Sequence, residues 1–571
     1  IMKCLQCTLC VARPARRSFS RGALHGGSLH SCKVPHAPVE LSFRFAADAP
    51  SKQAGKRSHF RALRHVQVAI ARSTCTEQVL DAIHGGPPVA LWPSITLATA
   101  WHRLAKHARS SSDRQKIRAA VRLLLSAHVK FSAADFSPRE LANITWAWGK
   151  LRCRQERHLE DMCAHAVARL DEFNARDLSN LAYATAMMDF RHDNFLQALC
   201  EHAALRITDF RDQELTNTVY ALAILRFTHS QLLSALCTDV PTRLSHLNEQ
   251  HISNTVYALG LLRFKDDKFL CTLCSNTASR LDEFKSQGIS NIVYALALLG
   301  FEHKELFNAI CTDVPRRLSE FSPQGISNTL YAFGLLHYKN INFLHAVCSH
   351  AMQRLADFNA QNIANTLYAL GVLDLRHDEF LLAVCRHCPP RFQEFKAQEL
   401  SNSIYALAQL GVRNEGFLRA MSQHVPSRLS EYNDQNIANT VAAFAALDCP
   451  SPDLLEAVSN HVPGRLDAFT PLCIAQIVRG MSLLSFCHEK LLRSVCVHCV
   501  DYRIAEFGEL ELSTLVHALG LLDFRHKKFL QALRIDVPGK LTSFKLEGLL
   551  SLTHGLVRLC TRPPWDRSRK K

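Results

Sequence analysis

Cysteine and histidine are the side chains in this sequence best suited to holding a metal ion. Pairs such as Cys348 and His350 resemble ligand pairs, but on a helix residues i and i+2 point about 200° apart and cannot chelate one ion. Cys271 and Cys274 could face one way, yet no partner pair accompanies them. We therefore expect no metal and no cofactor, and thiols that pack as small hydrophobes. Eight of them share one register: Cys163, Cys200, Cys237, Cys274, Cys311, Cys348, Cys385 and Cys496.

Catalytic motifs are equally scarce. The sequence has no phosphate-binding loop, no Gly-rich dinucleotide fingerprint and no GxSxG. Its carboxylates and histidines recur with a fixed period, as scaffold residues do, whereas an active site would break the period. Apolar runs fall short of the ~18–20 residues that span a bilayer. We expect neither an enzyme nor a membrane protein, and no small-molecule substrate.

Asparagine and aromatic side chains recur three residues apart, which suits contact with nucleic-acid bases. Because residues i and i+3 share a helix face, amides that bond base edges and rings that stack on bases would run side by side. The alternative is a packing seam in which the Asn bonds neighbouring backbone. The columns hardly vary, so they cannot encode a sequence, and packing is favoured. They comprise Asn143, Asn180, Asn217, Asn254, Asn291, Asn328, Asn365, Asn402 and Asn439, with Trp146, Tyr183, Tyr220, Tyr257, Tyr294, Tyr331, Tyr368 and Tyr405.

A second column varies from copy to copy. It lies three residues before each Asn, in the first turn of a helix. A variable polar position in a constant frame is what a code of one base per repeat requires. Helix-start chemistry is the alternative, because acidic residues favour a helix N-terminus. The members are Glu140, Asp177, Glu214, His251, Gly288, Gly325, Asn362, Glu399 and Asn436.

A basic column could form a rail for phosphate groups. An acid often follows three residues later, as Glu283 follows Arg280. Such pairing, together with the preference of cations for a helix C-terminus, explains the column without RNA. We favour this structural interpretation. The column consists of Arg169, Arg206, Arg243, Arg280, Arg317, Arg354, Arg391, Arg428 and Arg465.

The elements that must carry these columns are pairs of helices. The Asn recurs every 37 residues, and degenerate copies at Gln476, Thr514 and Ser551 complete twelve, with one step of 38. Ser322 and Pro323 have the types typical of a helix start. An apolar helical stripe, a polar break and a second helix such as 380–392 follow. We predict an all-α protein, a right-handed-type α-solenoid of about twelve 37-residue helix-turn-helix repeats.

The charge is concentrated at the two ends of the chain. Of the formal net charge of +16, +11 belongs to residues 1–75 and +4 to residues 562–571, which leaves +1 for residues 76–561. The Arg-rich, acid-poor start is typical of an organelle transit peptide; a basic tail that touches RNA is the alternative. We expect a disordered targeting region at 1–75, a helical cap at 76–130, the solenoid at 131–556 and a basic tail at 557–571. The location would be the mitochondrion, or alternatively a plastid.

The segment 321–336, Phe-Ser-Pro-Gln-Gly-Ile-Ser-Asn-Thr-Leu-Tyr-Ala-Phe-Gly-Leu-Leu, and its relatives resemble the octotricopeptide and heptatricopeptide repeat families. They are also similar to the helical repeats of FAST-kinase-like organellar proteins. Many members end in a nuclease-like RAP domain, which we do not expect here. The final copies carry Ala442, Arg479, His517 and His554 in place of the aromatic residue. We expect these copies to act as caps, with a doubtful role in RNA contact.

The resemblance implies an organellar RNA-binding protein. Its members bind single-stranded mRNA or rRNA and act in RNA processing, stabilisation, translation or ribosome assembly. Partners would be that RNA and ribosomal or other ribonucleoprotein subunits, with about one base per repeat. The alternative is a protein–protein scaffold of the armadillo or HEAT kind, or a structural subunit of a large ribonucleoprotein.

Overall fold

The computed structural model describes residues 53–108 and 110–561, and the described residues form helices without a single strand. The chain divides into two compact units, Ile1–Cys153 and Arg154–Lys571. Residues 1–52 of the expected targeting region and residues 562–571 of the expected basic tail lie outside the described residues. The all-α prediction is confirmed.

The first unit is built around two buried tryptophans. Trp101 and Trp148 meet edge to face with ring centroids 6.0 Å apart, and the ring of His128 lies 4.8 Å from that of Trp148. The helices are α2 (Gln53–Arg72), α3 (Thr76–His84), α4 (Ser94–His107), α5 (Ser111–Lys116), α6 (Arg118–His128) and α7 (Pro138–Leu151), with 3₁₀ turns η2 (Val89–Leu91) and η3 (Ala133–Asp135).

Helix α2 corrects one sequence prediction. Residues 1–75 were expected to be disordered, yet α2 runs through the last part of that range and packs on α3 and α4. Val66 and Ile70, four residues apart, are buried. This i, i+4 apolar pair supplies the hydrophobic contact that the basic composition concealed.

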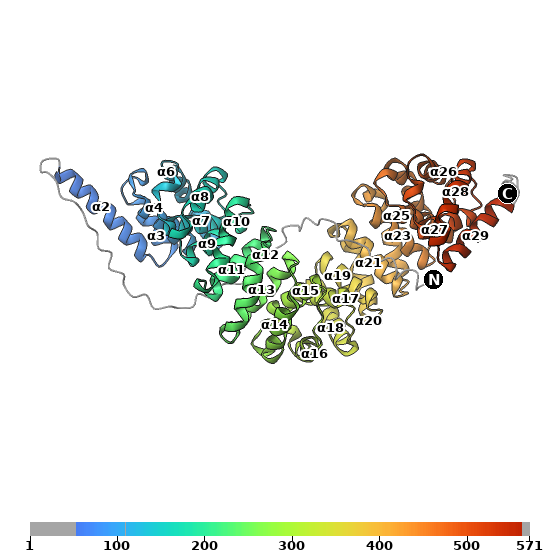
Figure 1. Cartoon of the computed structure of the whole chain (residues 1–571), viewed down its shortest axis with the longest axis horizontal. Helices are drawn as coiled ribbons and strands as arrows, with labels where there is room; N and C mark the ends of the chain where they lie inside the picture. Colours follow the sequence, from blue (N-terminus) through green and yellow to red (C-terminus); the bar gives the residue numbers. More distant parts are fainter. Residues whose placement is uncertain (1–52, 109, 562–571) are drawn as a thin grey trace. The chain divides into compact units, whose positions relative to one another are not determined.

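The second unit repeats one arrangement from end to end (Figure 1). Each repeat has a first helix, a second helix and a short tight turn of helix. The first helices are α9 (Ala175–Met187), α11 (Asp212–Ile224), α13 (Glu249–Leu262), α15 (Ser286–Leu298), α17 (Pro323–Leu335), α19 (Ala360–Val372), α21 (Ala397–Gln409), α23 (Asp434–Ala446), α25 (Pro471–Leu483), α27 (Glu509–Leu521) and α29 (Leu546–Thr561). The second helices are α8 (Glu156–Ala168), α10 (Asp193–Leu205), α12 (Ser230–Asp239), α14 (Asp267–Ser279), α16 (Lys304–Asp313), α18 (Ile341–Gln353), α20 (Asp378–His387), α22 (Glu415–His424), α24 (Pro452–His461), α26 (Glu489–His498) and α28 (Lys527–Lys540).

The tight turn is the element that the sequence did not predict. The second helix was expected to continue to Phe392, but α20 ends at His387 and the 3₁₀ segment η10 (Pro389–Glu394) follows. At η10, Pro389 and Pro390 lack the N–H that would continue the α-helical hydrogen bonds. Proline does not define the turn in general, because equivalent segments such as Leu170–Glu172 contain none. The residue after η10, Phe395, is fully buried between repeats. The equivalent segments are η4 (Leu170–Glu172), η5 (Ile207–Asp209), η6 (Val240–His246), η7 (Leu281–Glu283), η8 (Val314–Glu320), η9 (Leu355–Asp357), η11 (Pro426–Glu431), η12 (Val462–Ala468), η13 (Cys499–Arg503, a π turn) with η14 (Ile504–Glu506), and η15 (Leu541–Ser543).

Polar side chains define where both helices of a repeat begin. The side chain of Asn248 accepts a hydrogen bond from the backbone N–H of His251 at 2.9 Å at the start of α13. Second helices often begin at a histidine; Nδ1 of His192 accepts from the N–H of Phe195 at 3.0 Å. These caps satisfy N–H groups that a helix leaves unpaired, so the sequence sets each helix start locally.

Successive first helices pack far more closely than successive second helices do. Small residues make this possible: a Cβ added to Gly260 of α13 would lie 2.6 Å from Cβ of Ala295 on α15. The row with the closer spacing lies on the inside of a curved stack. In the middle of the second unit, α13, α15 and α17 accordingly line the inner side and α14, α16 and α18 the outer side (Figure 1).

Candidate nucleic-acid interface

The exposed face of the first helices carries the Asn and aromatic columns. All nine Asn side chains are half-buried, and so are the aromatic ones, except Tyr405, which is buried. Within the part of the chain that the structure describes, no hydrogen bond reaches the Asn side chains from Asn143 to Asn402. Asn439 alone accepts one, from Nε2 of Gln435 at 2.7 Å. The bonds to neighbouring backbone that the packing interpretation required are therefore missing among these residues.

The tyrosine rings form a ladder along the same face. Ring centroids of Tyr183 and Tyr220 lie 6.4 Å apart, as do those of Tyr220 and Tyr257, while Tyr331 and Tyr368 are 5.4 Å apart. Burial raises the pKa of Tyr257 to about 12, and it also raises the pKa of Tyr183 and Tyr220. Their hydroxyl groups stay protonated at neutral pH and can donate a hydrogen bond.

In the first unit the pattern begins with Asn143 and Trp146 on α7. The Trp146 ring lies 5.3 Å from the ring of His102, and Nζ of Lys150 lies 4.9 Å from its centroid. The indole is thus packed beside a cation, as cation–π pairs are.

A glutamine column belongs to this face and was missed by the sequence analysis. It lies four residues before the Asn, one helical turn away, so amide, amide and ring follow one another on each helix. These side chains are exposed, apart from the half-buried Gln435. The 37-residue period alone would have revealed them. We call the Gln, Asn and Tyr columns of the second unit the amide–tyrosine track; its glutamines are Gln213, Gln250, Gln287, Gln324, Gln361, Gln398 and Gln435.

The variable column is placed beneath this face, where successive first helices meet. Asn362 is 6% exposed; its Nδ2 donates to Oγ of Ser327 on the preceding helix at 3.0 Å. Asn436 makes the same contact with Ser401. In the same column, an added Cβ at Gly288 would lie 2.7 Å from Oγ of Ser253.

Several members of this column also cap their own helix. Carboxylates of Glu140, Glu214 and Glu399 accept from the backbone N–H three residues earlier, at 2.8–3.0 Å. Asp177 is buried, and Gly325 faces Ser290. His251 differs, because its buried Nδ1 has no hydrogen-bond partner among the described residues. The column thus has helix-start and inter-repeat contacts, and base readout by it stays a prediction.

The arginine column joins one repeat to the next. Arg317 donates to the carbonyl oxygen of Phe284 in the preceding repeat at 2.8 Å and forms ion pairs with Asp313 and Glu320 at 3.0 Å. Arg391 and Arg428 repeat this contact with Phe358 and Phe395. The remaining arginines are engaged with a carbonyl of the preceding repeat, a nearby acid or the histidine four residues earlier: Arg169, Arg206, Arg243, Arg280, Arg354 and Arg465.

These contacts predict that Arg317 serves stability. Replacing Arg317 with Gln should lower the free energy of unfolding by about 1–2 kcal/mol, because charge-assisted hydrogen bonds between repeats are lost. The adjacent Arg316 is exposed, and Arg316→Gln should stay within about 0.5 kcal/mol of wild type. Chemical denaturation measures both. A tenfold loss of RNA affinity in Arg317→Gln, at unchanged stability, would instead establish a phosphate rail.

The cysteine column lies inside the repeats. Burial raises the pKa of Cys163, Cys200, Cys348 and Cys385 to about 12, so these thiols stay protonated. No group of three His, Cys, Asp or Glu side chains within the described residues could hold a metal ion. None of the described helices is long and apolar enough to cross a bilayer.

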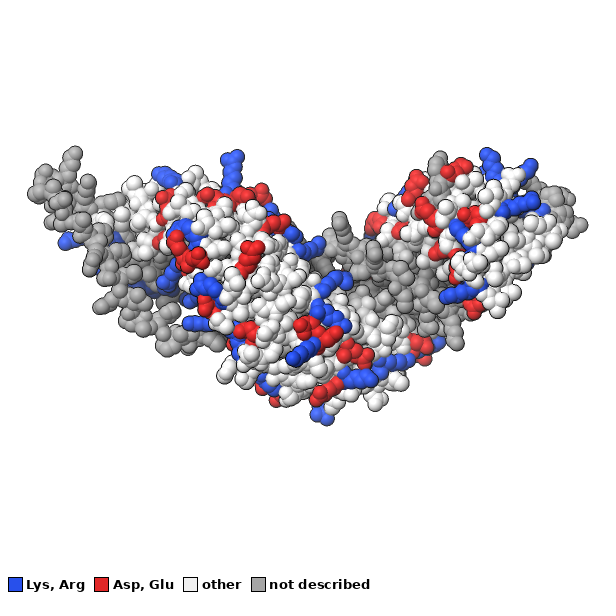
Figure 2. Space-filling model, in the orientation of Figure 1, with Lys and Arg blue, Asp and Glu red and all other residues white. Residues whose placement is uncertain are grey.

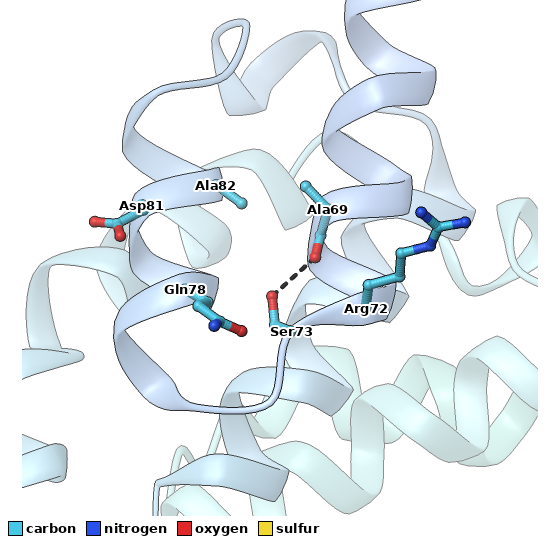
Figure 3. Close-up of a pocket in the computed structure, with 6 residues that line it drawn as sticks. All are labelled: Ala69, Arg72, Ser73, Gln78, Asp81 and Ala82. Carbon is cyan, nitrogen blue, oxygen red and sulfur yellow. Dashed lines mark hydrogen bonds between the residues drawn. The ribbon is translucent and has the colours of Figure 1, made fainter.

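A shallow cleft between α2 and α3 offers no convergent chemistry (Figure 3). Oγ of Ser73 donates to the carbonyl oxygen of Ala69 at 2.9 Å, so the hydroxyl is occupied. The cleft is lined by Ala69, Arg72, Ser73, Gln78, Asp81 and Ala82.

Charged groups on the visible face of the second unit alternate in sign, with wide uncharged areas between them (Figure 2).

Fold and surface together define a helical-repeat solenoid whose inner helices present a nearly uncharged polar and aromatic track. The family model described as RNA-editing substrate-binding complex 6 protein matches residues 202–430 and 410–542, together more than half of the chain. The chain belongs to this family, an RNA-associated group of helical-repeat proteins. The match does not separate the octotricopeptide from the heptatricopeptide type.

Other comparisons add little. No curated protein matches the chain. A chain in the homology model of the full-length AP-3 complex in an intermediate open conformation is 12% identical over 89% of each chain, with a TM-score of 0.29. A similarity this weak carries no argument about fold or function.

Proposed function

We propose that this protein binds single-stranded RNA along the amide–tyrosine track, as a component of an RNA-editing or RNA-processing complex. The observation that carries the proposal is the row of half-exposed amides without hydrogen-bond partners among the described residues, beside regularly spaced tyrosine rings. Amides pair with base edges and rings stack on bases. The family to which the chain belongs supports RNA as the ligand. The role is binding rather than catalysis.

The ring spacing favours an unstacked strand. Bases stacked in a duplex strand lie about 3.4 Å apart, whereas neighbouring rings Tyr183, Tyr220 and Tyr257 are 6.4 Å apart. A strand that follows these rings must separate its bases by nearly twice the stacked distance. One base per repeat fits this spacing, and the footprint would be on the order of 10–12 nucleotides.

The charge distribution predicts weak salt dependence. Residues 76–561 carry a net charge of +1, and the arginines of the column are engaged in contacts within the protein, so few phosphate counterions are released on binding. Affinity for RNA should therefore fall less than about tenfold between roughly 50 and 200 mM salt, where binders with many phosphate contacts lose about 10³–10⁵. Fluorescence anisotropy of the chain without residues 1–52 measures this; a steep loss would point to charge-driven binding.

Crosslinking with sequencing of bound RNA in the source organelle tests the function itself. We expect enriched single-stranded sites, in the mitochondrion if the basic N-terminal segment is a transit peptide. Recovery of proteins but no enriched RNA would instead support a scaffold within a large ribonucleoprotein. Repeating the experiment with His251→Gly and Asn362→Gly tests the variable column, because altered sequence preference at unchanged helix content requires readout there.

A further inference from the structure

The amide–tyrosine track changes chemistry at its C-terminal end. On α25, α27 and α29 the position of the tyrosine is taken by Arg479, His517 and His554. Three basic residues thus replace three tyrosines in one column. Their helices pack against each other like the first helices before them. Ala442 on α23 already replaces the tyrosine, and the three helices after it all carry a basic residue at this position.

His517 and His554 are neighbours, and Arg479 lies on α25, which packs against the helix of His517. The rings of His517 and His554 have centroids 5.0 Å apart at an angle of 54°. His554 is exposed, while Arg479 and His517 are half-buried. Within the described residues, no hydrogen bond or ion pair holds the guanidinium of Arg479, in contrast with the arginine column that joins the repeats. This arginine is free to bind an anion.

The surroundings of the cluster are basic. Besides burial, the groups that lower the pKa of His517 are His554, Arg479 and Arg558, all of them bases. Arg558 itself donates to the carbonyl oxygen of Gly520 at 3.0 Å and lies 3.9 Å from Asp523. Asp523 lies beside Arg558 and no ion pair among the described residues engages Arg479, so the guanidinium of Arg479 remains a positive charge that an anion approaching from solvent would stabilise.

We propose that Arg479, His517 and His554 form a phosphate-binding site at the end of the amide–tyrosine track. The inference rests on the proposed RNA function and assigns the ligand of the last repeats: a phosphate group of the bound RNA. Arginine offers a planar fork of donors to phosphate oxygens, and imidazole adds one N–H when neutral and two when protonated. The phosphate is either the terminal phosphate of the RNA or a phosphate of its backbone. In both cases the track has a part that binds nucleobases and an end that binds phosphate.

Binding of matched RNAs distinguishes these sources. Unstructured RNAs of about 12 nucleotides, identical in sequence but with 5′-phosphate, 3′-phosphate or hydroxyl ends, are titrated against the full chain. The variants are Arg479→Gln with His517→Gln, and Arg479→Tyr with His517→Tyr, which restores the ring found in earlier repeats. Arg493→Gln is the control, since Arg493 lies on a second helix, where it pairs with Glu489, and the substitution removes the same charge as Arg479→Gln.

If a chain terminus is bound, one phosphorylated RNA binds about tenfold tighter than the hydroxyl form, and both double variants abolish that preference. If a backbone phosphate is bound, end groups have no effect, but both double variants lose about tenfold in affinity and reduce the salt slope by about one. Double variants that behave like Arg493→Gln, with wild-type RNA binding intact, overturn the site alone. Wild-type protein that binds none of the RNAs contradicts the proposed function, and the site falls with it.

Discussion

Replacing Tyr220 and Tyr257 together with leucine is expected to reduce the affinity for single-stranded RNA by about 30-fold or more. Each ring is half-buried on the inner face, and the two centroids lie 6.4 Å apart. Loss of a base–aromatic stack costs about 1–3 kcal/mol, and leucine keeps the helix and part of the apolar contact. Fluorescence anisotropy with an unstructured RNA gives the dissociation constants directly.

Phenylalanine at the same two positions is the matched control. It keeps the ring and removes only the hydroxyl, so Tyr220→Phe with Tyr257→Phe should bind within a few-fold of wild type. Thermal unfolding must show that the leucine variant remains folded at the temperature of the assay. Unchanged affinity in the leucine variant, at equal stability, would mean that the tyrosines only pack and that RNA, if bound, lies elsewhere.

Alanine at Gly260 is expected to destabilise the solenoid by about 1–2 kcal/mol net. The new Cβ would lie 2.6 Å from Cβ and 2.7 Å from Cα of Ala295, and backbone atoms cannot move aside as a flexible side chain can. Helices α13 and α15 must separate, which has the cost of overpacking. That cost exceeds the gain of about 0.5–1 kcal/mol from replacing a helical glycine. Denaturant unfolding measures the net change.

The same substitution at Gly539 supplies the contrast. Gly539 lies in α28, and an added Cβ there meets nothing within 4 Å. Gly539→Ala should therefore stabilise the protein by about 0.5–1 kcal/mol, the opposite sign. Gly260→Ala should also weaken RNA binding, because it changes the interval between Tyr257 and Tyr294. If both substitutions changed the free energy of unfolding equally, the close packing of the first helices would not depend on the glycine at position 260.

The helices themselves follow from local sequence. A Ser before Pro323, an Asn before Glu249 and an apolar stripe of helical period act within a few residues of each other, and both helices begin where these signals lie. The tight turn at η10 and the helix α2 were missed. At η10 a proline changes the type of helix locally. In α2 two buried apolar residues lie within a basic segment, and the basic composition of that segment led to the prediction of disorder.

The sequence by itself determined the 37-residue period, the presence of twelve helical repeats and the register of every column, since these depend on residue order alone. It also contained the Gln column. The tertiary structure decided which columns face solvent and which join repeats. Arg317 reaches the carbonyl of Phe284 and Asn362 reaches Ser327, contacts made only when one repeat stacks on the next. Stacking places members of the variable column, such as Asn362 and Asn436, in contact with the preceding helix, and it leaves the Gln, Asn and most Tyr side chains partly accessible to solvent.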